Sequence, residues 1–141
     1  MPMKTELTNI QRQALGRLDI EKLNAMQLAA LEQCRRSDSM VLLSPTGTGK
    51  TLAFLLPLLE RLDPSCNKVQ AVIVLPSREL ARQVSEVWRA MATPFQMTAL
   101  YGGRPLEQEV ASLGGASTSV IVGTPGRLLD HLNRGSFAVD R

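Results

Sequence analysis

Short apolar runs alternate along the chain with longer stretches in which apolar residues recur every three or four positions. An unbroken apolar run is typical of a strand buried in a parallel sheet, and the longer period is typical of a helix packed on that sheet. The runs predict strands at residues 40–43, 70–75, 95–101 and 119–122. Strands and helices in alternation predict an α/β fold with a mostly parallel sheet covered on both faces.

Helical stretches open the chain and separate these strands. Asn24, Ser77 and Thr124 stand where N-cap residues are expected, because their side chains can accept hydrogen bonds from the first turn of a helix. Pro57 is expected to bend or shorten its helix. His131 lies among polar residues and is assigned to the surface. The predicted helices cover residues 7–18, 24–36, 51–62, 77–88, 106–113 and 124–132.

Bulk composition narrows the class of protein without naming a function. A chain of 141 residues with 44% hydrophobic residues has the length of one domain, and residues 1–22 are predicted to form a helical lead-in to residues 23–141. The formal charge of +3 permits a nucleic-acid partner but does not require one. Two cysteines lack the spacing of a zinc site, and no signal or membrane-spanning segment is visible, so a soluble cytoplasmic protein is expected.

The stretch SPTGTGKT, residues 44–51, separates an apolar run from a predicted helix. Ser44 stands where a strict phosphate-binding loop has its first glycine, but the two later glycines can still turn backbone N–H groups toward a phosphate. Lys50 adds a positive charge, and Thr51 at the start of the helix can hold Mg²⁺. The alternative is a glycine turn with a chance lysine. Kinases, transporters, motor proteins and helicases all use such a loop.

Three further strand ends carry unusual residues and should open on one edge of the sheet. They are PSREL at 76–80, YGG at 101–103 and GTPGR at 123–127. Each alone can be explained as a helix cap or a turn. Together they form a row of helix N-termini and bare backbone flanked by Arg78, Arg104 and Arg127. Helix amides and arginines can hold a sugar-phosphate chain without reading its bases.

The order of these motifs resembles that of the first RecA-like domain of a DEAD-box RNA helicase. SPTGTGKT is similar to motif I of that family, PSRELA to motif Ia, YGG to the GG motif and TPGR to motif Ib. The resemblance covers nearly the whole chain from about Leu23 onward. It implies a RecA-like P-loop NTPase fold, a three-layer sandwich incomplete at its C-terminus, with ATP and Mg²⁺ as ligands and RNA as partner. Residues 23–141 would form part of that domain.

The resemblance also assigns roles to matching positions of this sequence. Lys50 and Thr51 would take the catalytic positions, and Thr51 would hold the metal. Gln27 would read the adenine edge, because an amide supplies both a donor and an acceptor. The implied nucleotide-binding residues are Gln27, Ser44, Thr46, Gly47, Thr48, Gly49, Lys50 and Thr51. The implied RNA-binding residues are Pro76, Ser77, Arg78, Gly102, Gly103, Thr124, Pro125, Gly126 and Arg127.

The sequence departs from the family pattern in three places. Residues 23–27 replace P-T-P-I-Q, and Ile10 stands where the family places an aromatic residue. The D-E-A-D segment and the second RecA-like domain are expected to follow residue 141. These 141 residues alone are therefore not expected to hydrolyse ATP, because phosphoryl transfer needs a metal-bound aspartate and a positioned water; uncovered apolar surface could make them self-associate. A non-catalytic nucleotide- or RNA-binding module, a DNA helicase and another P-loop NTPase stay open as alternatives.

Overall fold

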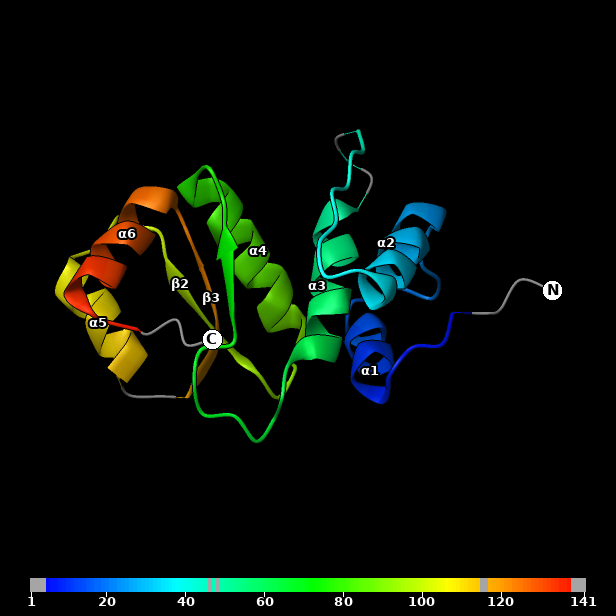
Figure 1. Ribbon diagram of the computed structural model, residues 1–141, viewed down its shortest axis with the longest axis horizontal. Helices are drawn as coiled ribbons and strands as arrows, with labels where there is room; N and C mark the ends of the chain where they lie inside the picture. Colours follow the sequence, from blue (N-terminus) through cyan, green and yellow to red (C-terminus); the bar gives the residue numbers. More distant parts are fainter. Residues whose placement is uncertain (1–4, 46, 48, 115–116, 138–141) are drawn as a thin grey trace. The chain divides into compact units, whose positions relative to one another are not determined.

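A computed structural model describes residues 5–45, 47, 49–114 and 117–137 of the chain. The chain divides into two compact units, Met1–Leu62 and Asp63–Arg141 (Figure 1). Within the described residues, no helix has both the length and the apolar character that a bilayer-spanning segment requires. The boundary expected between a lead-in at 1–22 and a domain at 23–141 stays a prediction.

The first unit contains helices α1 (Asn9–Arg17), α2 (Ala25–Arg36) and α3 (Lys50–Arg61). Thr8 and Asn24 cap α1 and α2, each in a capping box with the glutamine three residues on, so the predicted cap at Asn24 is confirmed. Helix α3 continues past Pro57 to Arg61, so the proline does not shorten it. Helix α3 packs on α2, and its buried apolar residues are Leu52, Ala53, Leu55, Leu56, Pro57 and Leu59.

The strand predicted at residues 40–43 is wrong. This segment has no regular secondary structure, and Val41 and Leu43 are 86% and 89% exposed. A strand needs a neighbouring strand to take up its backbone hydrogen bonds. Every strand among the described residues lies in the other unit. An apolar run therefore indicated the tendency to form a strand, but its pairing depended on residues elsewhere in the chain.

A polar network joins the three helices of the first unit. The Gln11 side chain accepts a hydrogen bond from Thr8 N–H and donates two, to the Leu56 carbonyl at 2.9 Å and to Glu60 at 3.0 Å. Arg35 on α2 donates from Nε to both Glu60 oxygens at 3.0 Å. The buried Gln11 thus uses its amide oxygen and both N–H groups, which removes the cost of burying an unpaired amide.

We expect this network to make the stability of the first unit depend on pH. The Arg35 guanidinium, helped by the Gln11 amide, holds the pKa of Glu60 below its usual range. Because the folded state binds the Glu60 proton less tightly than the unfolded chain, the stabilisation is present above about pH 4.5 and is lost as the pH falls through the folded pKa. Its expected size is about 0.5–1 kcal/mol, because both side chains are partly exposed.

Urea denaturation between pH 3 and pH 7 checks this expectation. Glu60→Gln should remove that component of the pH dependence, and Arg35→Ala should remove it as well, because the arginine is the main cause of the shift. A Glu60→Gln variant whose stability falls with acid as steeply as that of the parent would contradict the assignment.

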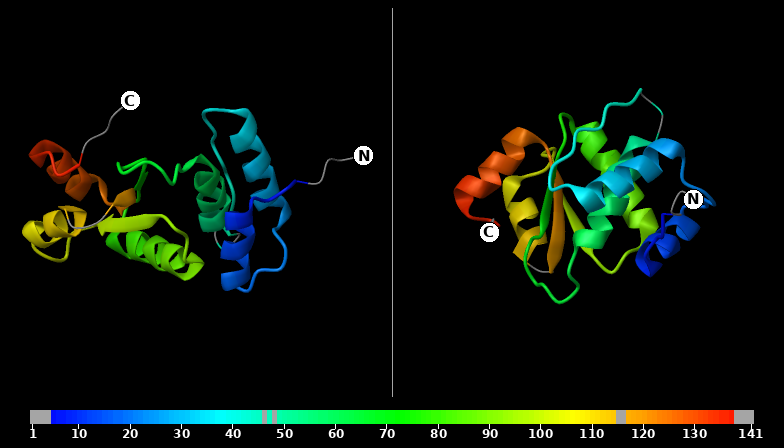
Figure 2. Two further views of the ribbon diagram at one scale, coloured as in Figure 1. Left: turned by 90° about the horizontal axis from the view of Figure 1, so that it is seen from below. Right: turned by 45° about the vertical axis from the view of Figure 1, so that its right-hand side comes forward.

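The second unit is an α/β layer structure around a parallel sheet, which confirms the predicted fold class. Strands β1 (Ala71–Val74), β2 (Gln96–Leu100) and β3 (Thr118–Gly123) lie in the order β1-β3-β2, and both pairings are parallel. Helix α4 (Arg78–Met91) lies on one face; α5 (Leu106–Gly114) and α6 (Pro125–Arg134) lie on the other (Figures 1 and 2). Such crossovers bring the carboxyl ends of the strands to one edge.

The core of this unit surrounds the central strand β3, all six residues of which are buried. On one face Ile121 packs with Leu100, Leu128 and Phe137. The buried face of α4 contributes Ala81, Val84, Trp88 and Met91. Strand β1 was predicted to be fully buried, but its residues Val72 and Val74 are 40% and 59% exposed. Helix α4 packs mainly on β2 and β3, and along β1 exposed side chains alternate with partly buried ones.

Candidate functional site

The predicted phosphate loop turns into helix α3 through two glycines in the left-handed region. Gly47 has φ +80° and Gly49 has φ +86°, which a residue with a Cβ adopts only at a cost. Gly49 is the N-cap of α3, so Lys50 and Thr51 occupy its first turn, where backbone N–H groups have no partner within the helix. Lys50 is exposed and makes no hydrogen bond or ion pair with another described residue. Thr46 and Thr48 lie outside the described residues.

Gln27 ties the start of α2 to this loop. Its Nε2 donates to the Gly49 carbonyl at 3.2 Å, and its Oε1 accepts from the Asn24 N–H at 3.0 Å. A Cβ at Gly49 would lie 2.5 Å from Gln27 Nε2, so a larger residue there would displace the Gln27 amide from this hydrogen bond. An amide can accept twice and donate twice, so each end of the side chain keeps capacity for one further partner. The predicted adenine contact is chemically compatible with this arrangement.

A cavity of about 660 Å³ lies next to the loop within the first unit. Its lining comes from the start of α2 and from the loop, namely Asn24, Ala25, Met26, Ser44, Pro45, Gly47 and Gly49. The exposed backbone at Gly47 and Gly49 and the exposed Lys50 are suited to binding a polyphosphate. The part of the chain that the structure describes has no group of three or more metal-ligating side chains. The Thr51 hydroxyl is an oxygen ligand of the kind that Mg²⁺ prefers, and this ion commonly keeps water and phosphate oxygens among its ligands.

The second unit brings together residues from the other three motifs. A Cβ placed on Gly102 would lie 3.3 Å from Arg127 Nη2 and 3.6 Å from Arg78 Nε, and one on Gly103 would lie 3.7 Å from Arg78 Nη1. Both glycines have positive φ, +81° and +83°. We call these four residues the arginine–glycine rim. It combines two cationic side chains with a glycine turn in which Gly102 is buried beneath the guanidinium groups and Gly103 is exposed.

The remaining residues of these motifs shape the helix starts around the rim. The Ser77 hydroxyl accepts a hydrogen bond from Leu80 N–H at 3.2 Å and caps α4. Thr124 is the N-cap of α6 and makes no capping hydrogen bond through its side chain, and Pro125 takes the first helical position. Pro76, Pro125 and Gly126 are exposed. Ser77 and Thr124 thus occupy the N-cap positions that were predicted for them.

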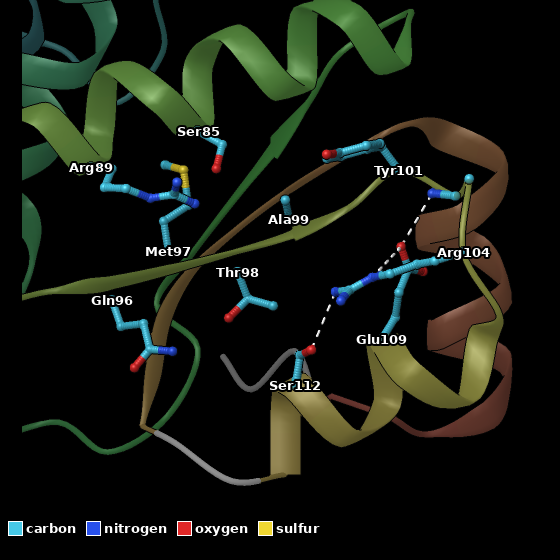
Figure 3. A pocket seen from close by; sticks show the side chains of 12 residues that line it. Ser85, Arg89, Gln96, Met97, Thr98, Ala99, Tyr101, Arg104, Glu109 and Ser112 are labelled. Atoms are coloured by element: carbon cyan, nitrogen blue, oxygen red, sulfur yellow. Dashed lines mark hydrogen bonds and ion pairs between the residues drawn. The ribbon is translucent and has the colours of Figure 1, made fainter.

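The structure adds a residue that the sequence analysis missed. Glu109 on α5 is 1% exposed and lies directly behind the rim. Its Oε2 accepts a hydrogen bond from the Gly102 N–H at 3.2 Å and lies 4.0 Å from Arg104 Nε, as Figure 3 shows. Its Oε1 lies 3.5 Å from Arg127 Nε and 3.0 Å from His131 Nε2. One carboxylate therefore joins the GG turn to helix α6.

The assignment of His131 to the surface is wrong. Its ring is fully buried, with Nε2 against Glu109 and with Nδ1 lacking a hydrogen-bond partner among the described residues. The helical periodicity of the sequence already indicated that Glu109 and His131 are buried. Glu109 stands three residues after Leu106 and one before Val110, on the inward stripe of α5. His131 follows the buried Leu128 by three positions on α6. A charged or polar residue on an inward stripe indicates a buried polar cluster.

Beside this cluster lies a cavity of about 480 Å³ between α4, β2 and α5. Figure 3 shows Arg89 and Ser85 of α4 on one side of strand β2 and Arg104, Glu109 and Ser112 on the other. Arg104 Nη2 donates to Ser112 Oγ at 3.2 Å. Arg104 is thus held by α5 and points along this cavity, whereas the sequence analysis placed it with Arg78 and Arg127.

Comparison with known proteins identifies the family. The family model described as DEAD/DEAH box helicase matches residues 24–140. The ATP-dependent RNA helicase CshA of Listeria monocytogenes is 36% identical over 129 residues, which cover 90% of this chain and 25% of that protein. The ATP-dependent RNA helicase DeaD of Escherichia coli is 36% identical over 132 residues, 92% of this chain and 21% of that protein. The chain thus spans about a quarter of the length of these relatives.

Solved structures give the same result for the fold. A DEAD box protein from the hyperthermophile Methanococcus jannaschii matches with a TM-score of 0.84 at 29% identity, over 96% of this chain and 37% of that one. Mss116p bound to ssRNA and AMP-PNP matches with a TM-score of 0.79 at 27% identity, over 92% of this chain and 28% of that one. With a family model that covers most of its length, the chain belongs to the DEAD/DEAH box helicase family.

Proposed function

We propose that this chain is the ATP-binding and RNA-backbone-binding N-terminal part of a DEAD-box ATP-dependent RNA helicase. In the intact protein, a second RecA-like domain would close on the first with ATP and RNA between them. The bend that closure imposes on one strand would open a short duplex, and hydrolysis would reset the protein. The relatives named above are RNA helicases, which supports RNA over DNA as the substrate.

The nucleotide site of this proposal lies at the loop and the start of α2. The backbone N–H groups at Gly47 and Gly49 and the Lys50 ammonium would hold the phosphates, with Ser44, Thr46 and Thr48 in the same loop. Gln27 would contact the adenine and Thr51 the Mg²⁺. Bound ATP would supply the free energy of phosphate hydrolysis to the conformational cycle. The 141 residues alone would bind nucleotide without turnover, and a cytoplasmic location belongs to the same proposal.

One observation supports the RNA site above all others, the convergence of Arg78, Gly102, Gly103 and Arg127 in the arginine–glycine rim. Arginine donates to phosphate oxygens in a planar fork, and the exposed backbone at Gly103 would admit the sugar-phosphate chain closely. Neither group reads base edges, so binding would be independent of sequence. Pro76, Ser77, Thr124, Pro125 and Gly126 would shape the helix starts that flank the RNA.

A non-catalytic nucleotide- or RNA-binding module would use the same rim and loop. The discriminating measurement is RNA-stimulated ATP hydrolysis by the intact protein, which a binding module lacks. A kinase or transporter with a phosphate loop would leave the rim without a ligand. Single-stranded DNA and RNA of one sequence, compared for stimulation, separate a DNA helicase from the function proposed.

We expect Arg78→Ala and Arg127→Ala each to weaken binding of a fluorescent single-stranded RNA about five- to tenfold, because each removes a charge-assisted phosphate contact. Fluorescence anisotropy over a salt series should show the slope of log K against log salt fall by about one for each arginine. Arg134→Ala is the matched control, because it removes the same charge from the far end of helix α6 and should leave the Kd within twofold. Equal affinity and equal slope for all three variants would refute the RNA site.

A further inference from the structure

The carboxylate of Glu109 is a buried charge with an unusual set of partners. A carboxylate this deeply buried is stable only when charges and hydrogen-bond donors surround it. Its donors come from two segments: the Gly102 N–H and Arg104 from the GG turn, and Arg127 and His131 from α6. An exposed surface ion pair would not need so many partners. The single side chain of Glu109 therefore contacts both the GG turn and helix α6, the two segments that carry RNA-binding motifs in the proposed function.

The contact with Arg127 sets the direction of the guanidinium. Glu109 meets Nε at 3.5 Å, and Nη2 lies 3.5 Å from the Arg104 carbonyl and beside Gly102. A guanidinium carries five N–H donors in a fixed plane. With Nε directed to the carboxylate, Nη2 is directed toward the GG turn. Protein groups therefore set the orientation of the Arg127 guanidinium at the rim.

The contact with Gly102 fixes the turn itself. The Gly102 N–H donates to Glu109 Oε2, and Gly102 adopts φ +81°. A glycine turn without such an anchor would sample many backbone conformations, and ordering it on RNA binding would cost entropy. His131 holds the carboxylate from the opposite side, and the carboxylate requires Nε2 of that ring to be the donor.

We propose that Glu109 is a positioning residue for the RNA backbone, which acts by orienting Arg127 and the Gly102–Gly103 turn before RNA binds. It makes no contact with RNA itself. This proposal rests on the proposed function, since it assigns to Glu109 the preorganisation of the same rim. It predicts that the effect of Glu109 on RNA binding passes through Arg127.

A double-mutant cycle on RNA affinity tests this coupling. Glu109→Gln keeps the size of the side chain and an oxygen acceptor but removes the charge that holds Arg127. We expect it to weaken binding of a fluorescent single-stranded RNA about fivefold in the parent, and less than twofold when Arg127 is already alanine. In an Arg78→Ala background the fivefold loss should persist, because Arg78 lies over the turn without contacting Glu109.

The outcomes separate this proposal from the proposed function. If Arg78→Ala and Arg127→Ala both leave RNA affinity unchanged, the RNA site itself is wrong. If both weaken binding but Glu109→Gln does not, or if its effect is the same in every background, Glu109 has only a structural role. Tighter RNA binding by Glu109→Gln would also overturn the proposal, because it would show that the carboxylate competes with phosphate for Arg127.

A second variant keeps the test decisive if Glu109→Gln does not fold. Glu109→Asp retains the charge and withdraws the carboxylate by one methylene, so it weakens the hold on Arg127 while a negative charge stays beside Arg104 and Arg127. We expect Glu109→Asp to weaken RNA binding in the parent and to have little effect when Arg127 is already alanine. If the effects of the two substitutions on RNA affinity simply add, the proposal is refuted. Circular dichroism melting of each variant establishes that the compared proteins are folded.

Discussion

Replacing Lys50 with alanine is expected to lower RNA-stimulated ATP hydrolysis by the intact protein at least about a hundredfold, the scale seen when one preorganised donor to a developing charge is removed. The lysine is the only side-chain cation of SPTGTGKT, and it stands in the first turn of α3 beside the Gly49 backbone. An ammonium there would neutralise charge on the phosphates that the loop is proposed to hold. The measurement is steady-state phosphate release at saturating RNA.

The loss should come without a loss of fold, which makes the result interpretable. Lys50 is exposed and has no hydrogen bond or ion pair with another described residue, so removing its side chain should change the free energy of unfolding by less than about 0.5 kcal/mol. Lys22→Ala is a suitable control, because Lys22 is also an exposed lysine and lies outside the loop. If the Lys50→Ala protein hydrolyses ATP at the parental rate, the proposal that Lys50 holds the phosphates of ATP is wrong.

The largest effect on stability is expected for Gly123→Ala, the last residue of β3. A Cβ at this position would lie 2.2 Å from the Leu100 carbonyl oxygen and 2.9 Å from Leu128 Cδ2. Leu128 can change rotamer, but the Leu100 carbonyl belongs to the strand paired with Gly123 and can move only if β2 and β3 separate. We expect the second unit to lose about 3 kcal/mol of stability, the upper part of the usual range for overpacking a core.

Gly126→Ala provides the matched comparison for stability. Gly126 is three residues further on, in the first turn of α6, and a Cβ there would meet no atom within 4 Å. Alanine has the higher helix propensity, so this variant should be unchanged or more stable by up to about 1 kcal/mol. Urea denaturation followed by circular dichroism measures both variants. Equal midpoints for Gly123→Ala and the parent would show that β2 and β3 do not pack as described.

The local elements could be predicted from the sequence because their causes are local. Asn24 and Ser77 were identified as caps because a helix start needs an acceptor beside its unpaired N–H groups, and both residues make those contacts. The parallel pairing of β1, β2 and β3 followed from strands that alternate with helices. Gly102 and Gly103 were identified as a turn of bare backbone, and both have positive φ, but only Gly103 is exposed.

The errors concern contacts between segments distant in the sequence. Val41 and Leu43 have the composition of a strand, but pairing requires a neighbour, and the segment has none within its unit. His131 was assigned by its polar neighbours in the chain, whereas its partner Glu109 lies on another helix. The exposure of Val72 and Val74 depends on which strands α4 covers. Strand pairing and the coverage of β1 are not encoded in a window of a few residues, and for His131 the helical period indicates burial but not the partner.

By itself, the sequence determined the alternation of helices and strands in the second unit, the helix caps and the four motifs that indicate the family. Tertiary structure decided which apolar runs pair into a sheet, which polar residues are buried, and how Glu109 joins Gly102 to Arg127. The physical reason is the separation along the chain over which each interaction acts. Capping, periodicity and φ preference act within one turn or one peptide unit, but strand pairing and the burial of a charge depend on partners that only the folded chain brings into contact.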